Sequence, residues 1–129
     1  MEEILLVMHP DNWELIKSGK KTIEIRQNKP KKIFYPFRAI VYITGEKKVV
    51  GKFDCCAIET TIMPETLAKQ SCMTEKEIRQ FAGGKSICGW YIKDGSVVEY
   101  ERAFTLIEAT GLSRHPNSWC YLNRVEQDG

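Results

Sequence analysis

The sequence contains no apolar run that approaches the ~20 residues needed to cross a lipid bilayer as a helix. Its start carries Glu2 and Glu3 in place of the basic residues of a secretory signal. These two absences predict a cytoplasmic protein with no membrane partner. The chain also has no repeat, low-complexity tract or linker, so its 129 residues are expected to form one domain, residues 1–129, around one modest core.

No C-x-x-C pair occurs among the cysteines, which number five and therefore cannot all pair within one chain. This spacing favours reduced thiols over a disulfide framework and argues against a zinc site. No metal and no cofactor are therefore expected. Cys55 and Cys56 are adjacent, and adjacent strand residues point to opposite faces, so at least one of them is expected to fill apolar space.

A strong net charge is also lacking, because 19 Lys and Arg residues oppose 17 Asp and Glu residues and the formal charge is only +2. That value is too small to indicate a nucleic-acid-binding protein by itself. The distribution is uneven, however. From Lys17 to Arg38, eight basic residues stand against a single acid, Glu24. The chain is therefore predicted to have one positive side, which makes an anionic partner plausible.

The first segments are clearly punctuated. Residues 4–8 form a continuous apolar run, which predicts a strand buried on both faces. A helix follows, with Pro10 in its first turn and Gly19 as the left-handed residue that ends it. Residues 22–27 then alternate, which places Ile23 and Ile25 on one face and the side chains of Thr22, Glu24 and Arg26 on the other.

The remainder predicts a mixed architecture. Residues 28–38 are typical of a loop, and residues 39–43 and 49–59 predict a hairpin with a bulge at Gly51. Short helices are expected at residues 64–70 and after Thr74, whose capping-box pattern opens a helix that carries Ile78 and Phe81 toward the core. The Asp94-Gly95 pair predicts a second hairpin, between strands at residues 86–92 and 97–107. The expected fold class is α+β, a small, partly closed barrel.

Three segments together resemble the ASCH domain family. They are the pattern Gly19-x-Lys21-x-x-Glu24-x-Arg26, the strand Val50-Gly51-Lys52-Phe53, and the closing Arg114-His115-Pro116-Asn117-Ser118-Trp119-Cys120-Tyr121. The last segment is similar to the tail of family members found in bacteria and their phages, which suggests a prophage-like origin. The resemblance covers most of the chain.

The resemblance implies a PUA-like small mixed β-barrel with short helices and a cleft beneath the first helix. ASCH domains are mostly described as RNA-binding modules. Some small members are hydrolases that remove acyl groups from the exocyclic amine of cytidine, and others have been reported to cleave RNA. The hydrolases are similar to this chain at Lys21 and Thr22. At the position of Glu24 the hydrolases have a threonine nucleophile, and near the position of Ser71 or Cys72 they have a glutamate. This chain has neither residue, so the same reaction is less favoured here.

The trio of Lys21, Glu24 and Arg26 has the chemistry to bind RNA or a nucleoside- or nucleotide-like ligand. A guanidinium fork and an ammonium match phosphate oxygens, and a carboxylate accepts hydrogen bonds from an exocyclic amine. The alternative is a solvated ion pair between Glu24 and Arg26, worth about 0–1 kcal/mol, with Lys21 capping a turn. The sequence leaves both interpretations open.

Catalysis by Lys21 and Glu24 is a second alternative, in which the protein acts on a modified nucleoside or on RNA. A general base would need Lys21 as an uncharged amine, whereas a carboxylate at Glu24 favours the ammonium. Lys21 therefore suits an electrostatic clamp better than a base. Whether the protein is an enzyme is left undecided at this point, and a protein-interaction module is a third class of function.

Further candidates surround the trio. Lys20 adds a cation beside Lys21, and Asn117, Ser118 and Trp119 are expected on the opposite wall of the cleft. Trp119 and Tyr121 share one face of a terminal strand, where aromatic rings either stack on a base or close the end of a core. Trp13 and Trp90 are expected in the core. The run Lys29-x-Lys31-Lys32 is either a solvated loop or a phosphate track beyond the cleft.

Overall fold

The computed structural model describes residues 1–122, so the end of the predicted domain at residue 129 lies outside the described part. The elements follow in the order β1 (Glu3–Met8), α1 (Pro10–Lys17), β2 (Ile23–Arg26), β3 (Phe37–Ile43), β4 (Lys48–Thr61), η1 (Pro64–Leu67), α2 (Ala68–Ser71), α3 (Glu75–Ala82), β5 (Ile87–Ile92), β6 (Val98–Phe104), α4 (Leu106–Thr110) and β7 (Trp119–Leu122).

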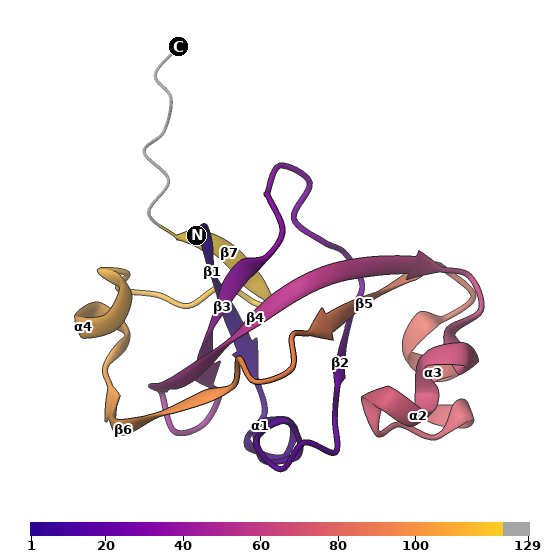
Figure 1. Ribbon diagram of the computed structural model, residues 1–129, viewed down its shortest axis with the longest axis horizontal. Helices are drawn as coiled ribbons and strands as arrows, with labels where there is room; N and C mark the ends of the chain where they lie inside the picture. Colours follow the sequence, from indigo (N-terminus) through magenta and orange to yellow (C-terminus); the bar gives the residue numbers. More distant parts are fainter. Residues whose placement is uncertain (123–129) are drawn as a thin grey trace.

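One seven-stranded mixed sheet organises residues 1–122, with strand order β2-β5-β4-β3-β1-β7 and β6 paired with β4. The β1–β3 pair is parallel and the other pairs are antiparallel. The strongly bent sheet carries α2 and α3 at one end and α4 at the other, with α1 below (Figure 1). The predicted α+β class, a small mixed sheet with short helices around it, is confirmed.

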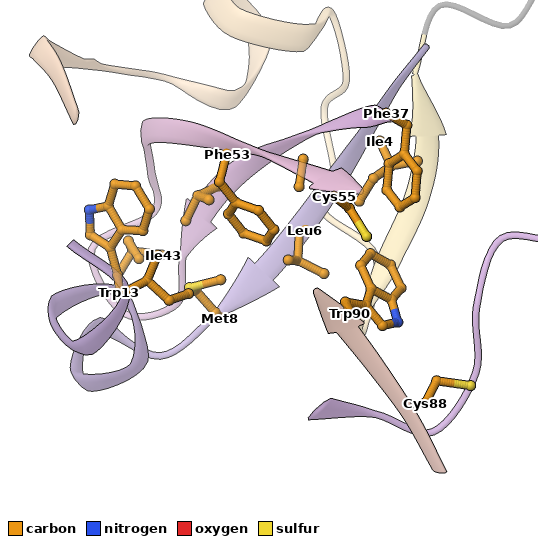
Figure 2. Packing of buried hydrophobic residues seen from close by; sticks show 13 residues of the cluster. Ile4, Leu6, Met8, Trp13, Phe37, Ile43, Phe53, Cys55, Cys88 and Trp90 are labelled. Carbon is orange, nitrogen blue, oxygen red and sulfur yellow. The ribbon is translucent and has the colours of Figure 1, made fainter. Parts of the chain in front are cut away.

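The main core lies inside the bend of the sheet. It extends from Trp13 on α1, past Phe53 and Leu6, to Trp90 and Phe37 (Figure 2). Both tryptophans are therefore core residues, as predicted. Burial raises the pKa of the Cys55 thiol to about 12, so this cysteine is the apolar filler of the Cys55-Cys56 pair.

Two smaller clusters cover the rest of the sheet. One joins Ile23 and Ile25 of β2 to Leu67 and Ile78, and so fixes α2 and α3 beside β2. The other lies under β6 and α4 on the opposite face. Because Ile23 and Ile25 are held by this cluster, Glu24 and Arg26 are turned the other way, as strand alternation predicts.

The β3–β4 hairpin forms as predicted, and its register shifts at Val50, next to Gly51. A Cβ atom on Gly51 would lie 2.2 Å from the Val98 carbonyl oxygen and 2.6 Å from the Trp13 ring. The glycine is therefore required because β6 and α1 both approach the backbone of β4 here.

The hairpin predicted around Asp94 and Gly95 is wrong. Within residues 1–122, β5 and β6 do not pair with each other, because both pair antiparallel with β4, along residues 55–61 and 49–52 respectively. The turn at residues 93–96 therefore links two strands, β5 and β6, that pair with different parts of β4. Asp54 holds it in place: its carbonyl accepts from the Lys93 N–H (2.8 Å), and its N–H donates to Ser96 Oγ (2.9 Å).

The strand predicted at residues 97–107 is too long. β6 ends at Phe104, and Thr105 opens the short helix α4 with a capping box to Glu108. The same pattern opens α3, where Thr74 and Glu77 form the predicted capping box. Reciprocal side-chain bonds to backbone N–H groups thus override the strand propensity of the apolar residues that follow.

Candidate functional site

The segment between α1 and β2 places the first candidate side chain. Gly19 takes a φ of +81° and ends α1, as predicted from its sequence position. The next backbone bonds run from the Lys21 N–H to the Leu15 carbonyl (3.1 Å) and from the Thr22 N–H to the Gln70 carbonyl (2.9 Å). Lys21 is therefore held between the end of α1 and the α2 region, with its side chain directed inward.

Lys21, Glu24 and Arg26 form a buried network. The Lys21 ammonium lies 2.9 Å from Glu24 Oε1, and Arg26 Nη2 lies 2.7 Å from Glu24 Oε2. Asn12 on α1 accepts a second bond from Lys21 Nζ (3.2 Å). Lys21 is 4% exposed and Glu24 2%. The solvated ion pair considered from sequence is thus replaced by a network that is removed from water.

The charge state of Glu24 is set by its two cationic neighbours. Burial alone would raise the pKa of this carboxyl group, but Arg26 and Lys21 outweigh burial, and the pKa lies below its ordinary value. Glu24 is therefore an anion at neutral pH. One carboxylate serves two cations, so the network carries one net positive charge.

Arg26 joins parts of the chain that lie far apart in sequence. Its Nη2 also donates to the Val7 carbonyl at the end of β1 (2.7 Å), and its Nη1 donates to Ser118 Oγ (3.0 Å). The Ser118 carbonyl in turn accepts the N–H of Val7 (2.9 Å). β2 and β7 are the two ends of the strand order, so Arg26 bridges the opening of the partly closed barrel.

A cleft of about 600 Å³ lies over this network. Its floor is formed by Lys21, Glu24 and Arg26, and the remaining lining residues come from five segments. They are Val7, Met8, His9 and Asn12 at the β1–α1 junction, Thr44 after β3, Asn117 and Ser118 before β7, Ile25, Gln27 and Asn28 in and after β2, and Cys72, Met73, Glu77 and Phe81 in and before α3.

The α3 wall corrects one sequence prediction. Phe81 was expected in the core with Ile78, but it is 39% exposed and lines the cleft. Ile78 and Ala82 supply the buried face of α3, which turns Phe81 toward the opening. Glu77 lines the same wall, and its carboxylate accepts the Thr74 N–H (2.9 Å) in the capping box.

Within residues 1–122, the cleft lining holds two basic side chains, Lys21 and Arg26, and two acidic ones, Glu24 and Glu77, so this part of the cleft is formally balanced. The excess of cations between residues 17 and 38 is partly neutralised in the same way. Lys17 pairs with Glu14 and Glu99, and Arg38 lies 3.5 Å from Asp54. Positive charge is therefore more available outside the cleft than within it.

The predicted site residues divide into two groups. The structure brings Lys21, Glu24, Arg26, Asn117 and Ser118 together around the cleft. Lys20 and Trp119 are not among its lining residues: Lys20 is exposed, and Trp119 packs against the core and donates from Nε1 to Asn28 Oδ1 (2.8 Å).

Several lining residues were not found from sequence. Asn12 had no signal of its own, because an asparagine in the first turn of a helix is equally consistent with an exposed side chain. His9, Thr44 and the α3 residues had none, because their proximity depends on how β3 and α3 meet the β1–α1 junction. Cys72 was indicated only by the family resemblance, near the position where the hydrolases have a glutamate. Across residues 1–122, no three His, Cys, Asp or Glu side chains are grouped as a metal ion would require. No helix in the same range is long and apolar enough to span a membrane.

This fold and cleft define a mixed α+β domain, a bent seven-stranded sheet with short helices and a cleft beside its first helix within residues 1–122. The chain is similar to ASCH from Zymomonas mobilis, with a TM-score of 0.76 and 23% identity over 95% of this chain and 88% of that one. A serine-to-alanine variant of that protein matches with a TM-score of 0.77 and 22% identity, over 95% and 89% of the two chains. A tyrosine-to-phenylalanine variant gives 0.76 and 22%, over 96% and 92%.

At this level of identity the likeness concerns the fold, and for the fold the predicted resemblance to ASCH domains is confirmed. No protein-family model matches the chain, and no curated protein matches it significantly.

Acid is expected to weaken the fold through Glu24. Because its two cationic neighbours hold its folded pKa below the ordinary value of a glutamate, its stabilising contribution is complete above the unfolded pKa. The contribution is then lost as the pH falls through the lower folded pKa. Urea midpoints measured between about pH 6 and pH 2 should therefore fall more steeply for the wild type than for Glu24→Gln. If the urea midpoints of the two proteins fall equally with pH, Glu24 is not the source of the acid sensitivity.

Proposed function

We propose that the protein binds RNA or a nucleotide-like ligand in the cleft above Lys21, Glu24 and Arg26. The observation that carries this proposal is the buried network at the floor of an open cleft of about 600 Å³. Burying three ionisable groups costs desolvation free energy, and apolar residues of similar volume often stabilise a protein as well or better. A network placed under an opening is therefore more readily explained by a ligand than by stability.

The remaining hydrogen-bonding capacity of the network suits a base edge. An ammonium has three donors, and within residues 1–122 Lys21 Nζ uses two of them, on Glu24 and Asn12. Each Glu24 oxygen bonds one cation and keeps lone-pair capacity for an exocyclic amine. Each terminal nitrogen of Arg26 already donates to two acceptors within the protein. Its proposed role is therefore to hold the cleft floor and the Ser118 wall in position.

Binding of labelled single-stranded RNA, measured by fluorescence anisotropy, tests the proposal. Lys21→Ala should weaken binding by about tenfold or more, because a hydrogen bond from a charged group is worth about 1.5–3 kcal/mol. Lys48→Ala, at an exposed position of β4 that is not among the cleft-lining residues, is the matched control and should bind as the wild type does. Equal losses in both variants, or no binding at low salt, would remove the proposal.

The alternative is an enzyme that acts on a modified nucleoside or on RNA. It is favoured by the 2.9 Å contact between Lys21 and Glu24 at the cleft floor, where an ammonium could polarise a carbonyl group and a carboxylate could orient water. Incubation with acylated cytidines and with RNA separates the two functions. Turnover that is lost in Lys21→Ala would favour the enzyme, whereas bound RNA without product would favour the binding module.

A further inference from the structure

The loop between β2 and β3 exposes a large aromatic side chain. Phe34 is 83% exposed, and Tyr35 beside it is 43% exposed. The loop stands out from the sheet at the top of the molecule (Figure 1). Its residues 27–36 include Lys29, Lys31 and Lys32 and no acidic residue. Cations and aromatic rings are thus interleaved on one exposed segment, the combination that suits single-stranded nucleic acid.

Contacts on both sides of Phe34 hold this loop against the core. The Tyr121 hydroxyl accepts the backbone N–H groups of Lys31 (3.1 Å) and Lys32 (3.4 Å). Ile33 packs against the main core, and the Tyr35 ring lies 5.6 Å from the Phe37 ring. The residues on both sides of Phe34 are therefore anchored, which leaves its ring at the surface where a base can stack on it.

The loop begins at the cleft. Gln27 and Asn28 line the cleft, and Asn28 is held by the indole N–H groups of Trp90 (3.3 Å, to its carbonyl) and Trp119 (2.8 Å, to its side chain). β7 runs alongside the loop: Trp119 bonds Asn28 at the start of the loop, and Tyr121 bonds Lys31 further along it. A strand that leaves the cleft over Asn28 would therefore continue along Lys29–Tyr35.

We propose that residues 29–35 form a second contact for single-stranded RNA, which engages nucleotides adjacent to the one in the cleft. A base stacks on Phe34, and Lys29 and Lys31 contact neighbouring phosphates. This inference rests on the proposed function and adds that the ligand is a strand longer than one nucleotide. Charge supports the division of roles, because the cleft is formally balanced whereas the loop is purely basic.

Phe34→Ala is the direct test, in binding titrations with a labelled RNA of about ten nucleotides and with a cytidine mononucleotide. A stacked base is worth about five- to hundredfold in affinity, so binding of the longer RNA should weaken by about tenfold or more. Binding of the mononucleotide should be unchanged. Ile62→Ala is the matched control, since Ile62 is also 83% exposed but lies after β4, outside the loop and the cleft lining.

Lys31→Ala provides an independent measurement. Each lost phosphate contact should reduce the slope of log affinity against log salt by about 0.7 for a single strand. Unchanged RNA affinity in Phe34→Ala, or an equal loss in Ile62→Ala, would overturn the second contact and leave the cleft proposal standing if Lys21→Ala still weakens binding. Failure of the wild type to bind either ligand would overturn both.

Discussion

Glu24→Gln is expected to lower the free energy of unfolding by about 3–5 kcal/mol. The glutamine keeps the size of the side chain but leaves Lys21 and Arg26 as two buried cations without their shared carboxylate. Glu24 is 2% exposed and lies within 2.9 Å of both cations, so solvent screening is weak. Removing one partner of a buried charge pair costs more than the pair itself contributes, because the remaining charge stays desolvated.

Urea denaturation followed by circular dichroism measures this loss. Glu99→Gln is the matched control, because Glu99 pairs with Lys17 at an exposed site and its removal should cost less than about 1 kcal/mol. A double-mutant cycle with Lys21→Met should show a coupling of about 0.5–3 kcal/mol, since the second change removes one of the unpaired cations. A loss below about 1 kcal/mol in Glu24→Gln would mean that the network is better solvated than its burial indicates.

Arg26→Ala is expected to produce a loss of similar size, about 3–5 kcal/mol, together with a local effect on the barrel opening. The change removes the ion pair to Glu24 and the bonds to the Val7 carbonyl and Ser118. The Ser118 segment keeps the Val7 N–H to Ser118 carbonyl bond and the pairing of β7 with β1, but loses its hydrogen bonds to β2 through Arg26. Amide exchange at Val7 should therefore accelerate by more than the global loss of stability explains.

Arg26→Lys separates charge from geometry at the same position. Lysine keeps one positive charge for Glu24 but cannot reach Val7 and Ser118 with a planar fork, so an intermediate loss is expected. Arg79→Ala is the matched control on α3, where exposed contacts to Glu65 and Glu75 should contribute less than about 1 kcal/mol. Equal stability of Arg26→Lys and the wild type would contradict a bridging role for the guanidinium.

Predictions from sequence succeeded where the signal was local. Gly19, the alternation from Ile23 to Arg26, and the capping box at Thr74 each depend on neighbours within four residues, and each appears in the structure. The Asp94-Gly95 hairpin failed because strand pairing is a long-range property. The turn is present, but β4 is long enough for β5 and β6 to pair with successive parts of it and not with each other.

The prediction that Phe81 lies in the core was wrong for a related reason. The position is three residues after the buried Ile78, which is consistent with a core residue on a helix. Only the packing of α3 against β2 and η1 decides how much of that face is covered, and Ile78 with Ala82 already fills it. Phe81 is left at the cleft wall.

The amino-acid sequence by itself determined the ionisable trio, its separation from Ile23 and Ile25, and the basic character of the β2–β3 loop, because these follow from residue identity and strand alternation. Only the tertiary structure decided that Glu24 is buried between two cations, that Arg26 bridges β2 to β1 and Ser118, and that Phe34 is held in solvent. The physical reason is that burial and long-range hydrogen bonds depend on segments up to 92 residues apart, as in the Arg26–Ser118 contact. Such contacts form only when the whole sheet closes.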